Sequence, residues 1–210
     1  MNEGYIQNMV NKGEKLKLDL HTHIWEASSF ETPSIDTAYK VINQCKKIGI
    51  DGIAITDHDH AHPDLLKISF EYYKIFTKHF PNEIVVFPGR EIELHMKHDY
   101  FQTYEVGEFM LPNGKLFRNY CHPGHPSQQI EINHIQSIEV NNSIHNWHIN
   151  KNQVYELADK HNLILTEVSD AHEINDIGKN YIEIPLEDLL SSGIDLNKLQ
   201  IQGWENHRSI

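Results

Sequence analysis

Residues 15–23, with the sequence KLKLDLHTH, carry the pattern that decides the fold and the chemistry of this chain. Apolar and polar residues alternate up to Leu20, which is typical of a strand with one buried face. The strand ends at His21 and His23, and side chains two residues apart on an extended backbone point to the same side. One metal ion can then bind both imidazoles. Asp19 is expected to stand behind them, where it orients a ligand or the turn.

The same succession of strand, polar cluster and helix recurs along the chain. Residues 52–56 (GIAIT) predict a strand that ends at Asp57 and His58, and residues 83–87 (EIVVF) predict a strand that leads to Glu91. Further strands are predicted at 137–140, 163–168 and 181–184, a hairpin turn at 112–114, and helices at 35–48, 63–76, 151–161 and, weakly, 186–199. Such alternation favours an α/β fold with a parallel sheet or closed barrel, whose ligands lie at the carboxyl ends of the strands.

Length and composition suit a single compact domain. The chain has 210 residues, of which 39% are hydrophobic and 23% charged. We expect residues 1–14 to form an N-terminal extension and residues 15–210 to form one domain. The first residues lack the apolar core of a signal peptide, and no apolar run reaches the length of a membrane span, so a cytoplasmic location without membrane contact is expected. Cys45 and Cys121 are interpreted as reduced, buried thiols.

The formal charge of −12 argues against an extended nucleic-acid surface, which needs clustered lysines and arginines. Two or three bound divalent cations would nevertheless make the site itself attractive to anions. A small phosphorylated substrate or nucleotide is therefore the expected partner. Arg90, Arg118 and Lys179 are the basic residues nearest to the polar clusters in sequence.

The polar clusters differ in how directly they follow a strand. His58 is preferred to His60 because it directly ends its strand, and a carboxylate such as Glu91 can bridge two ions, which one imidazole cannot do. His122 precedes a Pro-Gly turn. Asp170 and His172 repeat the spacing of two residues seen in the first cluster. The alternative interpretation of each cluster is a set of hydrogen-bonded side chains at a strand end.

Two other histidines, His145 and His148, lie in the segment SIHNWHIN together with Trp147. This segment follows a predicted strand, so these side chains are expected either to line the mouth of the fold and contact substrate or to pack on the surface.

Taken in order, the motifs resemble those of the polymerase and histidinol phosphatase (PHP) domain family. The matching segments are Asp19-Leu20-His21-Thr22-His23, Thr56-Asp57-His58-Asp59, Gly89-Arg90-Glu91-Ile92, Cys121-His122-Pro123, Ile138-Glu139-Val140-Asn141 and Ser169-Asp170-Ala171-His172. The resemblance covers residues 18–184. It implies a distorted (β/α)7 barrel of the TIM type, two or three Zn, Mn or Fe ions at the C-terminal ends of the strands, and phosphoester hydrolysis.

The resemblance also implies a set of ligands. One ion takes His21, His23, Glu91 and Asp170, a second shares Glu91 and takes His122, and a third takes His58 and His172.

The chain departs from the family pattern at two places. Where the family offers an aspartate or histidine after the first motif, this chain has Ser28 and Ser29, and Glu26 is the nearest replacement. The histidine expected before His122 has no counterpart in FQTYEVGEF, residues 101–109. His95 and His98 are the candidates that remain for that position.

The leading functional hypothesis is a phosphomonoesterase or phosphodiesterase that acts on a small metabolite, a nucleotide or an oligonucleotide end. Metal-activated hydroxide would attack phosphorus, with His122 and Asp170 in the catalytic centre and Asp19 and Asp57 orienting ligands behind it. Two alternatives stay open at this point. An amidohydrolase-like C–N hydrolase also begins with His-x-His but commonly needs a bridging lysine, and a metal-binding module without catalysis would keep the ligands alone.

Overall fold

The computed structural model describes residues 13–199 and Trp204. Most of the N-terminal extension predicted for residues 1–14 therefore lies outside the described residues. In the part of the chain that is described, no helix has the length and apolar character required to cross a membrane.

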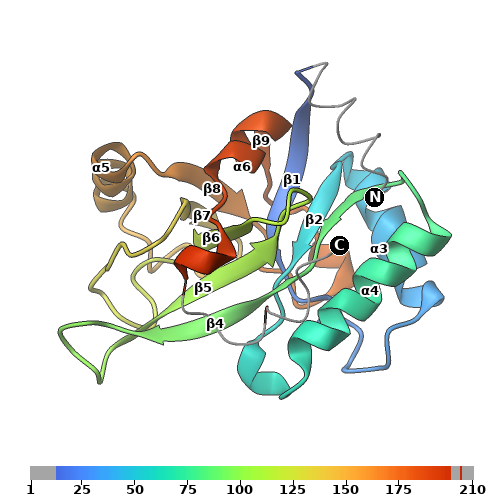
Figure 1. Ribbon diagram of the computed structural model, residues 1–210, viewed down its shortest axis with the longest axis horizontal. Coiled ribbons are helices and arrows are strands. Elements are labelled where there is room, and N and C mark those ends of the chain that lie inside the picture. Colours follow the sequence, from blue (N-terminus) through green and yellow to red (C-terminus); the bar gives the residue numbers. More distant parts are fainter. Residues whose placement is uncertain (1–12, 200–203, 205–210) are drawn as a thin grey trace.

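The strands form two sheets, seen in Figure 1 as one group around β1 and another around β5. Their bounds are β1 Lys15–Thr22, β2 Gly52–Ile55, β3 Val85–Phe87, β4 Gly89–His95, β5 Thr103–Met110, β6 Leu116–Tyr120, β7 Ser137–Asn142, β8 Ile164–Val168 and β9 Ile182–Pro185. The first sheet has the order β3-β2-β1-β9 and the second the order β4-β5-β6-β7-β8.

Both sheets mix parallel and antiparallel pairs. β1, β2 and β3 are parallel, but β9 runs antiparallel to β1. In the second sheet β4, β5 and β6 form an antiparallel meander, and β6, β7 and β8 are parallel. The turn predicted at 112–114 is confirmed: it joins β5 to β6, and Gly114 adopts a φ of 74° there. The prediction of a parallel sheet is therefore wrong for the middle of the chain, because a tight turn joins only antiparallel strands.

The helices flank the sheets, with α3 and α4 side by side on the right of Figure 1 and α5 on the opposite side. Their bounds are α2 Ile24–Ala27, α3 Ile35–Ile48, α4 Leu65–His79, α5 Lys151–His161 and α6 Leu186–Ser192, with short 3-10 turns at Asp59–Ala61, Ile174–Asp176 and Leu196–Lys198. In α3 the Ser34 hydroxyl caps the first turn, and Gly49 ends the helix in the left-handed conformation. Ile35 and Ile48, which lie at the two ends of the helix, are 48% and 40% exposed.

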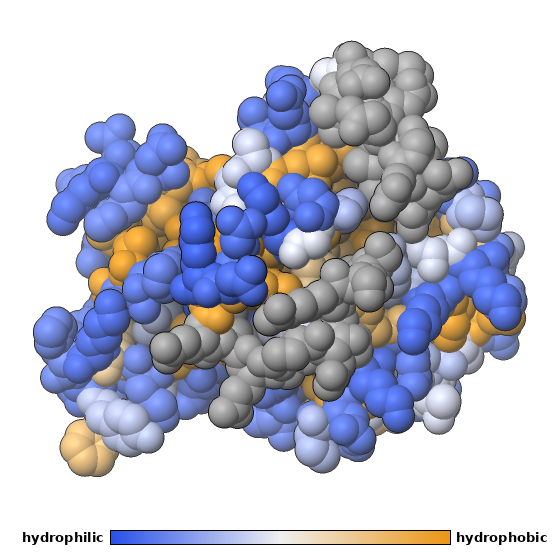
Figure 2. All heavy atoms as spheres, in the orientation of Figure 1, coloured by the Kyte–Doolittle hydropathy of each residue, from blue (hydrophilic) through white to orange (hydrophobic). Residues whose placement is uncertain are grey.

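Four apolar clusters of the described residues hold these elements together. One lies between helices α3 and α4 and the first sheet, and includes Val41, Ile53 and Phe76. A second lies where the two sheets face each other and includes Leu18 and Phe109. The third lies under α5. The fourth includes Phe70, Met110 and Trp204. On the face shown in Figure 2, hydrophilic side chains cover most of the surface and apolar atoms are visible in the hollows between the outer segments.

The two sheets meet at the ends of the strands that carry the predicted ligands. Isolated parallel bridges join Thr22 to Ala171 and His58 to Glu91. The stretch from β3 to β4 leaves the first sheet at Pro88 and enters the second, so that Glu91 lies beyond the carboxyl end of β3. The mixed α/β class is therefore confirmed, but the described strands form two sheets joined by single bridges and no continuous closed (β/α)7 barrel.

Candidate metal centre

The structure brings the side chains from all the predicted clusters to the junction of the two sheets. We call this group the central cluster; it comprises His21, His23, Glu26, His58, Glu91, Glu105, His122, Asp170 and His172. The first motif lies at the end of β1, and the other histidines and Asp170 follow β2, β6 and β8. β1 and β2 are parallel, as are β6, β7 and β8, so within each sheet these carboxyl ends lie at one edge. The bridges from Thr22 to Ala171 and from His58 to Glu91 bring the two edges together.

The innermost group consists of His21, His23 and Asp170. The Nε2 atoms of the two imidazoles are only 3.1 Å apart, and the Oδ1 atom of Asp170 lies 3.1 Å from Nε2 of His23 and 3.5 Å from Nε2 of His21. Both histidines are fully buried, and Asp170 is 2% exposed. Two ring nitrogens and a carboxylate oxygen that converge away from water form the donor set of a divalent transition-metal ion.

Glu91 lies at the centre of the cluster and faces different imidazoles with its two oxygens. Its Oε2 atom is 3.3 Å from Nε2 of His21 and 3.3 Å from Nε2 of His58, while its Oε1 atom is 3.4 Å from Nε2 of His122. The side chain is buried, and neither oxygen has a hydrogen-bond partner among the described residues. A buried carboxylate of this kind is costly unless it is paired with positive charge. The arrangement therefore fits a carboxylate that bridges two cations.

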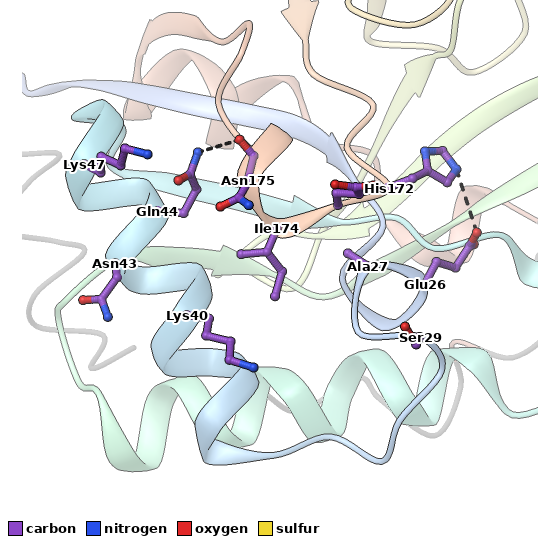
Figure 3. A pocket seen from close by; sticks show the side chains of 11 residues that line it. Glu26, Ala27, Ser29, Lys40, Asn43, Gln44, Lys47, His172, Ile174 and Asn175 are labelled. Carbon is purple, nitrogen blue, oxygen red and sulfur yellow. Dashed lines mark hydrogen bonds and ion pairs between the residues drawn. The ribbon is translucent and has the colours of Figure 1, made fainter.

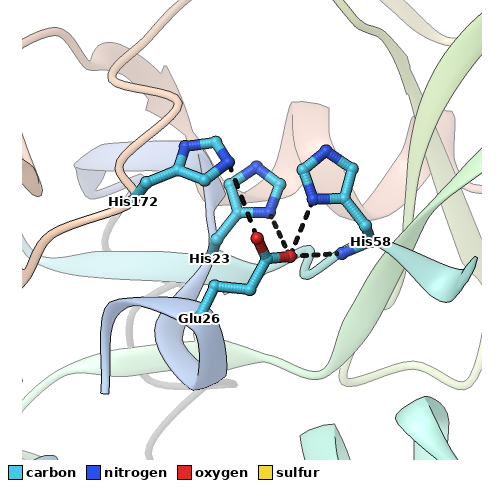
Figure 4. A group of neighbouring side chains, drawn as sticks. All are labelled: His23, Glu26, His58 and His172. Atoms are coloured by element: carbon cyan, nitrogen blue, oxygen red, sulfur yellow. Dashed lines mark hydrogen bonds and ion pairs between the residues drawn. The ribbon is translucent and has the colours of Figure 1, made fainter. Parts of the chain in front are cut away.

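A second group, drawn in Figure 4, surrounds the carboxylate of Glu26. Glu26 lies in α2, and its Oε1 atom is 2.7 Å from Nδ1 of His58 and 3.5 Å from Nδ1 of His23. Its Oε2 atom is 3.8 Å from Nε2 of His172. The ring of His23 lies between those of His58 and His172, with ring centroids 4.4 and 4.0 Å away. Glu26, rather than Ser28 or Ser29, occupies the position after the first motif.

Glu105 belongs to the cluster, although the sequence did not single it out. Its Oε2 atom lies 3.6 Å from Nε2 of His122 and 3.9 Å from Nδ1 of His125. β5 runs antiparallel to β6, so the beginning of β5 lies beside the end of β6. The prediction considered only residues that follow strands, and Glu105 lies near the start of its strand. The available signal was Glu105 itself, the first of the two acidic residues inside FQTYEVGEF.

His95 and His98, the two predicted substitutes for the missing histidine, lie outside the central cluster. Both are exposed. The His95 ring stacks on Tyr100 with centroids 4.0 Å apart, and its Nδ1 atom lies 2.9 Å from the Tyr100 carbonyl oxygen. His95 is four residues beyond Glu91 on the same strand, a separation of about 13 Å. The structure therefore places neither His95 nor His98 in the central cluster, whereas Glu105 lies beside His122.

Glu139, on β7, lies behind the central cluster and orients the ring of His21 and the backbone of His122. Its carboxylate is fully buried and lies 2.8 Å from Nδ1 of His21, which turns Nε2 of that ring toward Glu91. It also accepts hydrogen bonds from the Asn119 amide, the backbone N–H of His122 and the Asn142 amide, at 2.8, 2.7 and 2.9 Å. Fixing the second nitrogen of a ligating histidine is the usual role of such a carboxylate.

Asp19 and Asp57 hold backbone segments rather than imidazole rings. Asp19 accepts hydrogen bonds from the N–H and the hydroxyl of Ser169 and from the N–H of Gly178, and so fixes the loop that presents Asp170. Asp57 accepts the N–H of Glu26 at 2.9 Å. Burial raises the pKa of both carboxyls to about 6, against the opposing effect of these hydrogen bonds. The orienting role predicted for them therefore acts through the backbone.

The electrostatics of the central cluster favour bound positive charge. Burial would lower the pKa of His23, but its contacts with Asp170 and Glu26 raise that pKa to about 9. Burial opposes protonation of His122 in the same way, and Glu91 raises its pKa to about 9. Burial would raise the pKa values of Glu91 and Asp170, but His21 holds both well below their ordinary range. In the absence of metal, protons on the imidazoles supply the charge that these carboxylates require.

A cavity of about 680 Å³ borders this cluster at Glu26 and His172 (Figure 3). Helix α3 lines its opposite side with Lys40 and Lys47, which are seven residues apart and therefore share one face of the helix. Both lysines are exposed, so their ammonium groups give the cavity a cationic wall. The basic residues nearest to the polar clusters in sequence were instead Arg90, Arg118 and Lys179. The guanidinium groups of Arg90 and Arg118 are both paired with Glu108, and the ammonium group of Lys179 is paired with Asp176.

The chain was compared with known proteins at three levels. No protein-family model and no curated protein sequence matches it. Among solved structures, it is similar to a protein of Bifidobacterium adolescentis proposed to be a metal-dependent phosphoesterase, with a TM-score of 0.58 and 12% sequence identity over 87% of this chain and 98% of that one. It is also similar to PsfC of Pseudomonas syringae, with a TM-score of 0.55 and 15% identity over 86% of this chain and 89% of that one. Both similarities establish a shared fold.

Proposed function

We propose that this protein is a metal-dependent phosphoesterase that hydrolyses a phosphomonoester or phosphodiester of a small phosphorylated compound. The proposal rests on Glu91, because both of its buried oxygens lack hydrogen bonds to any described residue and face different imidazoles. A carboxylate in this arrangement can hold two cations at once, as hydrolases with two metal ions require. The solved structure with the proposed phosphoesterase activity has a similar fold, which is consistent with the assignment.

The proposed ligands fall into three sets that share Glu91 or His23. The first set is His21, His23, Glu91 and Asp170, and the second is Glu91, Glu105 and His122, in which both carboxylates face the His122 ring. The third set is Glu26, His58 and His172 with His23 beside them. Nitrogen and carboxylate donors of this kind suit Zn²⁺, Mn²⁺ or Fe²⁺. We further propose that the chain is a single-domain member of the PHP family and that its two sheets are a variant of the family's (β/α)7 barrel.

Divalent ions in such a site supply an activated water and neutralise charge on a phosphoryl group. The protein supplies the geometry. Glu139 holds the Nδ1 side of His21, so Nε2 stays directed at Glu91. Asp19 fixes the loop before Asp170, and Lys40 offers a positive charge at the wall of the adjoining cavity. Substrate phosphate is thereby attracted to the side of the cluster that opens at Glu26 and His172.

The experiment is an assay of metal-stripped protein after reconstitution with Mn²⁺, Zn²⁺ or Fe²⁺. Phosphomonoesters, phosphodiesters and amides are offered in parallel, and the His21→Ala and Asp170→Ala variants are tested under the same conditions. We expect phosphate release with the metal-loaded protein and a loss of at least 100-fold in each variant, because each removes a proposed ligand. Variants as active as the wild type would refute the assignment. Hydrolysis of amides alone would indicate a C–N hydrolase, and metal uptake without any turnover would indicate a binding module.

A further inference from the structure

Three histidines outside the central cluster converge at its rim. His125 lies in the loop after β6, and His145 and His148 lie between β7 and α5. Each offers one ring nitrogen, and the three nitrogens lie within 4.8 Å of one another. The ring centroids of His125 and His145 are 4.7 Å apart, as are those of His125 and His148. Such a separation suits three ligands of one ion better than three independent surface side chains.

The two loops that carry these histidines are held together by close backbone contact. Gly124 has a φ of 108°, and a Cβ atom at that position would lie 2.4 Å from the carbonyl oxygen of His148. Only glycine permits this approach. The second loop is fixed as well, since the Asn142 side chain accepts the N–H of His145 at 2.9 Å and the N–H of His148 donates to the His145 carbonyl at 3.0 Å. The three imidazoles are therefore set close together by the fold.

Two of the ring nitrogens lack partners. The Nδ1 atoms of His125 and His145 are buried and make no hydrogen bond to any of the described residues. The nearest carboxylate to Nδ1 of His125 is Glu105, whose Oε2 atom lies 3.9 Å away, beyond hydrogen-bond distance. Buried polar atoms in native proteins are normally satisfied. An ion bound between the loops would give these imidazoles the partner that the described residues do not supply.

We propose that His125, His145 and His148 bind one Zn²⁺ ion in addition to the ions of the central cluster. Three imidazoles without a carboxylate suit Zn²⁺, Cu²⁺ and Ni²⁺, whereas Mg²⁺ and Mn²⁺ prefer oxygen ligands. Three protein ligands leave a fourth position for water or for an anionic group. The ion adds positive charge at the rim of the proposed active site. The proposal does not depend on phosphoesterase activity, because it concerns ion binding alone.

The rim site adjoins the central cluster, since the rings of His122 and His145 lie 4.5 Å apart. Its test must therefore distinguish the two sites by their choice of metal. Metal-stripped protein is dialysed against Mn²⁺ or against Zn²⁺, and the bound ions per chain are counted by elemental analysis. We expect one more Zn²⁺ than Mn²⁺ in the wild type. The His148→Ala variant is expected to lose this one Zn²⁺ ion and to keep its Mn²⁺ content unchanged.

Two control variants are matched to His148→Ala. Asn146→Ala changes an exposed residue of the same loop, and His161→Ala removes an exposed histidine at the end of α5. Both are expected to keep the additional Zn²⁺ ion. If circular dichroism shows that His148→Ala is misfolded, His148→Gln removes the imidazole with a smaller change in volume. Equal numbers of Zn²⁺ and Mn²⁺ in the wild type, or retention of the additional Zn²⁺ in a folded His148 variant, would overturn the proposal.

Discussion

Replacement of Glu139 by glutamine is predicted to weaken metal binding although it replaces no proposed metal ligand. The Glu139 carboxylate faces hydrogen-bond donors on both sides, with His21 Nδ1 and the Asn119 amide at one oxygen and the His122 N–H and the Asn142 amide at the other. A glutamine amide presents one oxygen and one NH₂ group. In either orientation of the glutamine side chain, its NH₂ group therefore faces two of these four donors.

The expected magnitude follows from the contacts that are lost. Two of the four hydrogen bonds disappear, and each bond to a charged group contributes about 1.5–3 kcal/mol, so the free energy of unfolding of the metal-free protein should fall by about 3 kcal/mol or more. In one orientation the ring of His21 loses the acceptor that directs its Nε2 atom toward Glu91, and in the other the backbone N–H of His122 loses its acceptor, so a proposed ligand loses support in either case. Loss of such a supporting contact typically weakens metal binding about 10- to 100-fold.

The assay is competition for Zn²⁺ or Mn²⁺ with a chelator of known affinity, combined with chemical denaturation of the metal-free proteins. Glu167→Gln is the matched control, because Glu167 is an exposed acid on the adjacent strand β8 whose carboxylate accepts a hydrogen bond from Asn141. It should bind metal like the wild type. Metal affinity of Glu139→Gln within twofold of the wild type would refute the role assigned to Glu139.

Three further predictions concern charge, substrate and ligands. In the folded metal-free protein the pKa of His23 is about 9, above the ordinary value of 6.5. The free energy of unfolding of the metal-free protein should therefore fall by about 3 kcal/mol as the pH rises from 6.5 to 9, and by less when metal is bound. Equal losses with and without metal in denaturation experiments would contradict this prediction. Lys40→Ala should raise the KM for a phosphate ester severalfold with little change in kcat, whereas Lys46→Ala, which lies outside the lining of the cavity, should leave both unchanged. Elemental analysis should show fewer bound ions in Glu105→Ala but not in His95→Ala, and the reverse result would restore His95 as the ligand.

Strand-end positions were the most informative signal in the sequence. His21, His58, His122 and Asp170 were all predicted because each lies at or just after the end of a strand, and the structure places them together. This reasoning works for strands that run parallel, since their carboxyl ends share one edge. It failed at Glu105, which lies near the start of a strand that runs antiparallel to its neighbour.

The role of Glu139 was harder to predict from the residues alone. Its motif was noticed, but an acid within SIEVNN gives no sign of which side chains it contacts. The structure shows that it joins β7 to His21, 118 residues earlier in the chain. One usable signal was that a charged residue inside an otherwise buried strand requires several partners, because burial of an unpaired carboxylate is costly.

The closure of the sheets also could not be predicted from local patterns. Alternation of strands and helices predicted the mixed α/β class and most element positions, because periodicity and caps act over a few residues. Whether the sheets join depends on contacts between distant segments, such as the single bridges from Thr22 to Ala171 and from His58 to Glu91. The alternation of apolar and polar residues along a single strand does not predict which distant segments pair.

The central claim is that Glu91 joins the polar clusters into one centre with more than one metal ion. The most direct test is elemental analysis of reconstituted wild-type protein and of the Glu91→Gln variant, in which the bridging carboxylate becomes an amide. We expect at least two tightly bound divalent ions per chain in the wild type and the loss of at least one in the variant. A wild-type protein that binds no divalent ion tightly, or a variant that retains the full number, would contradict it.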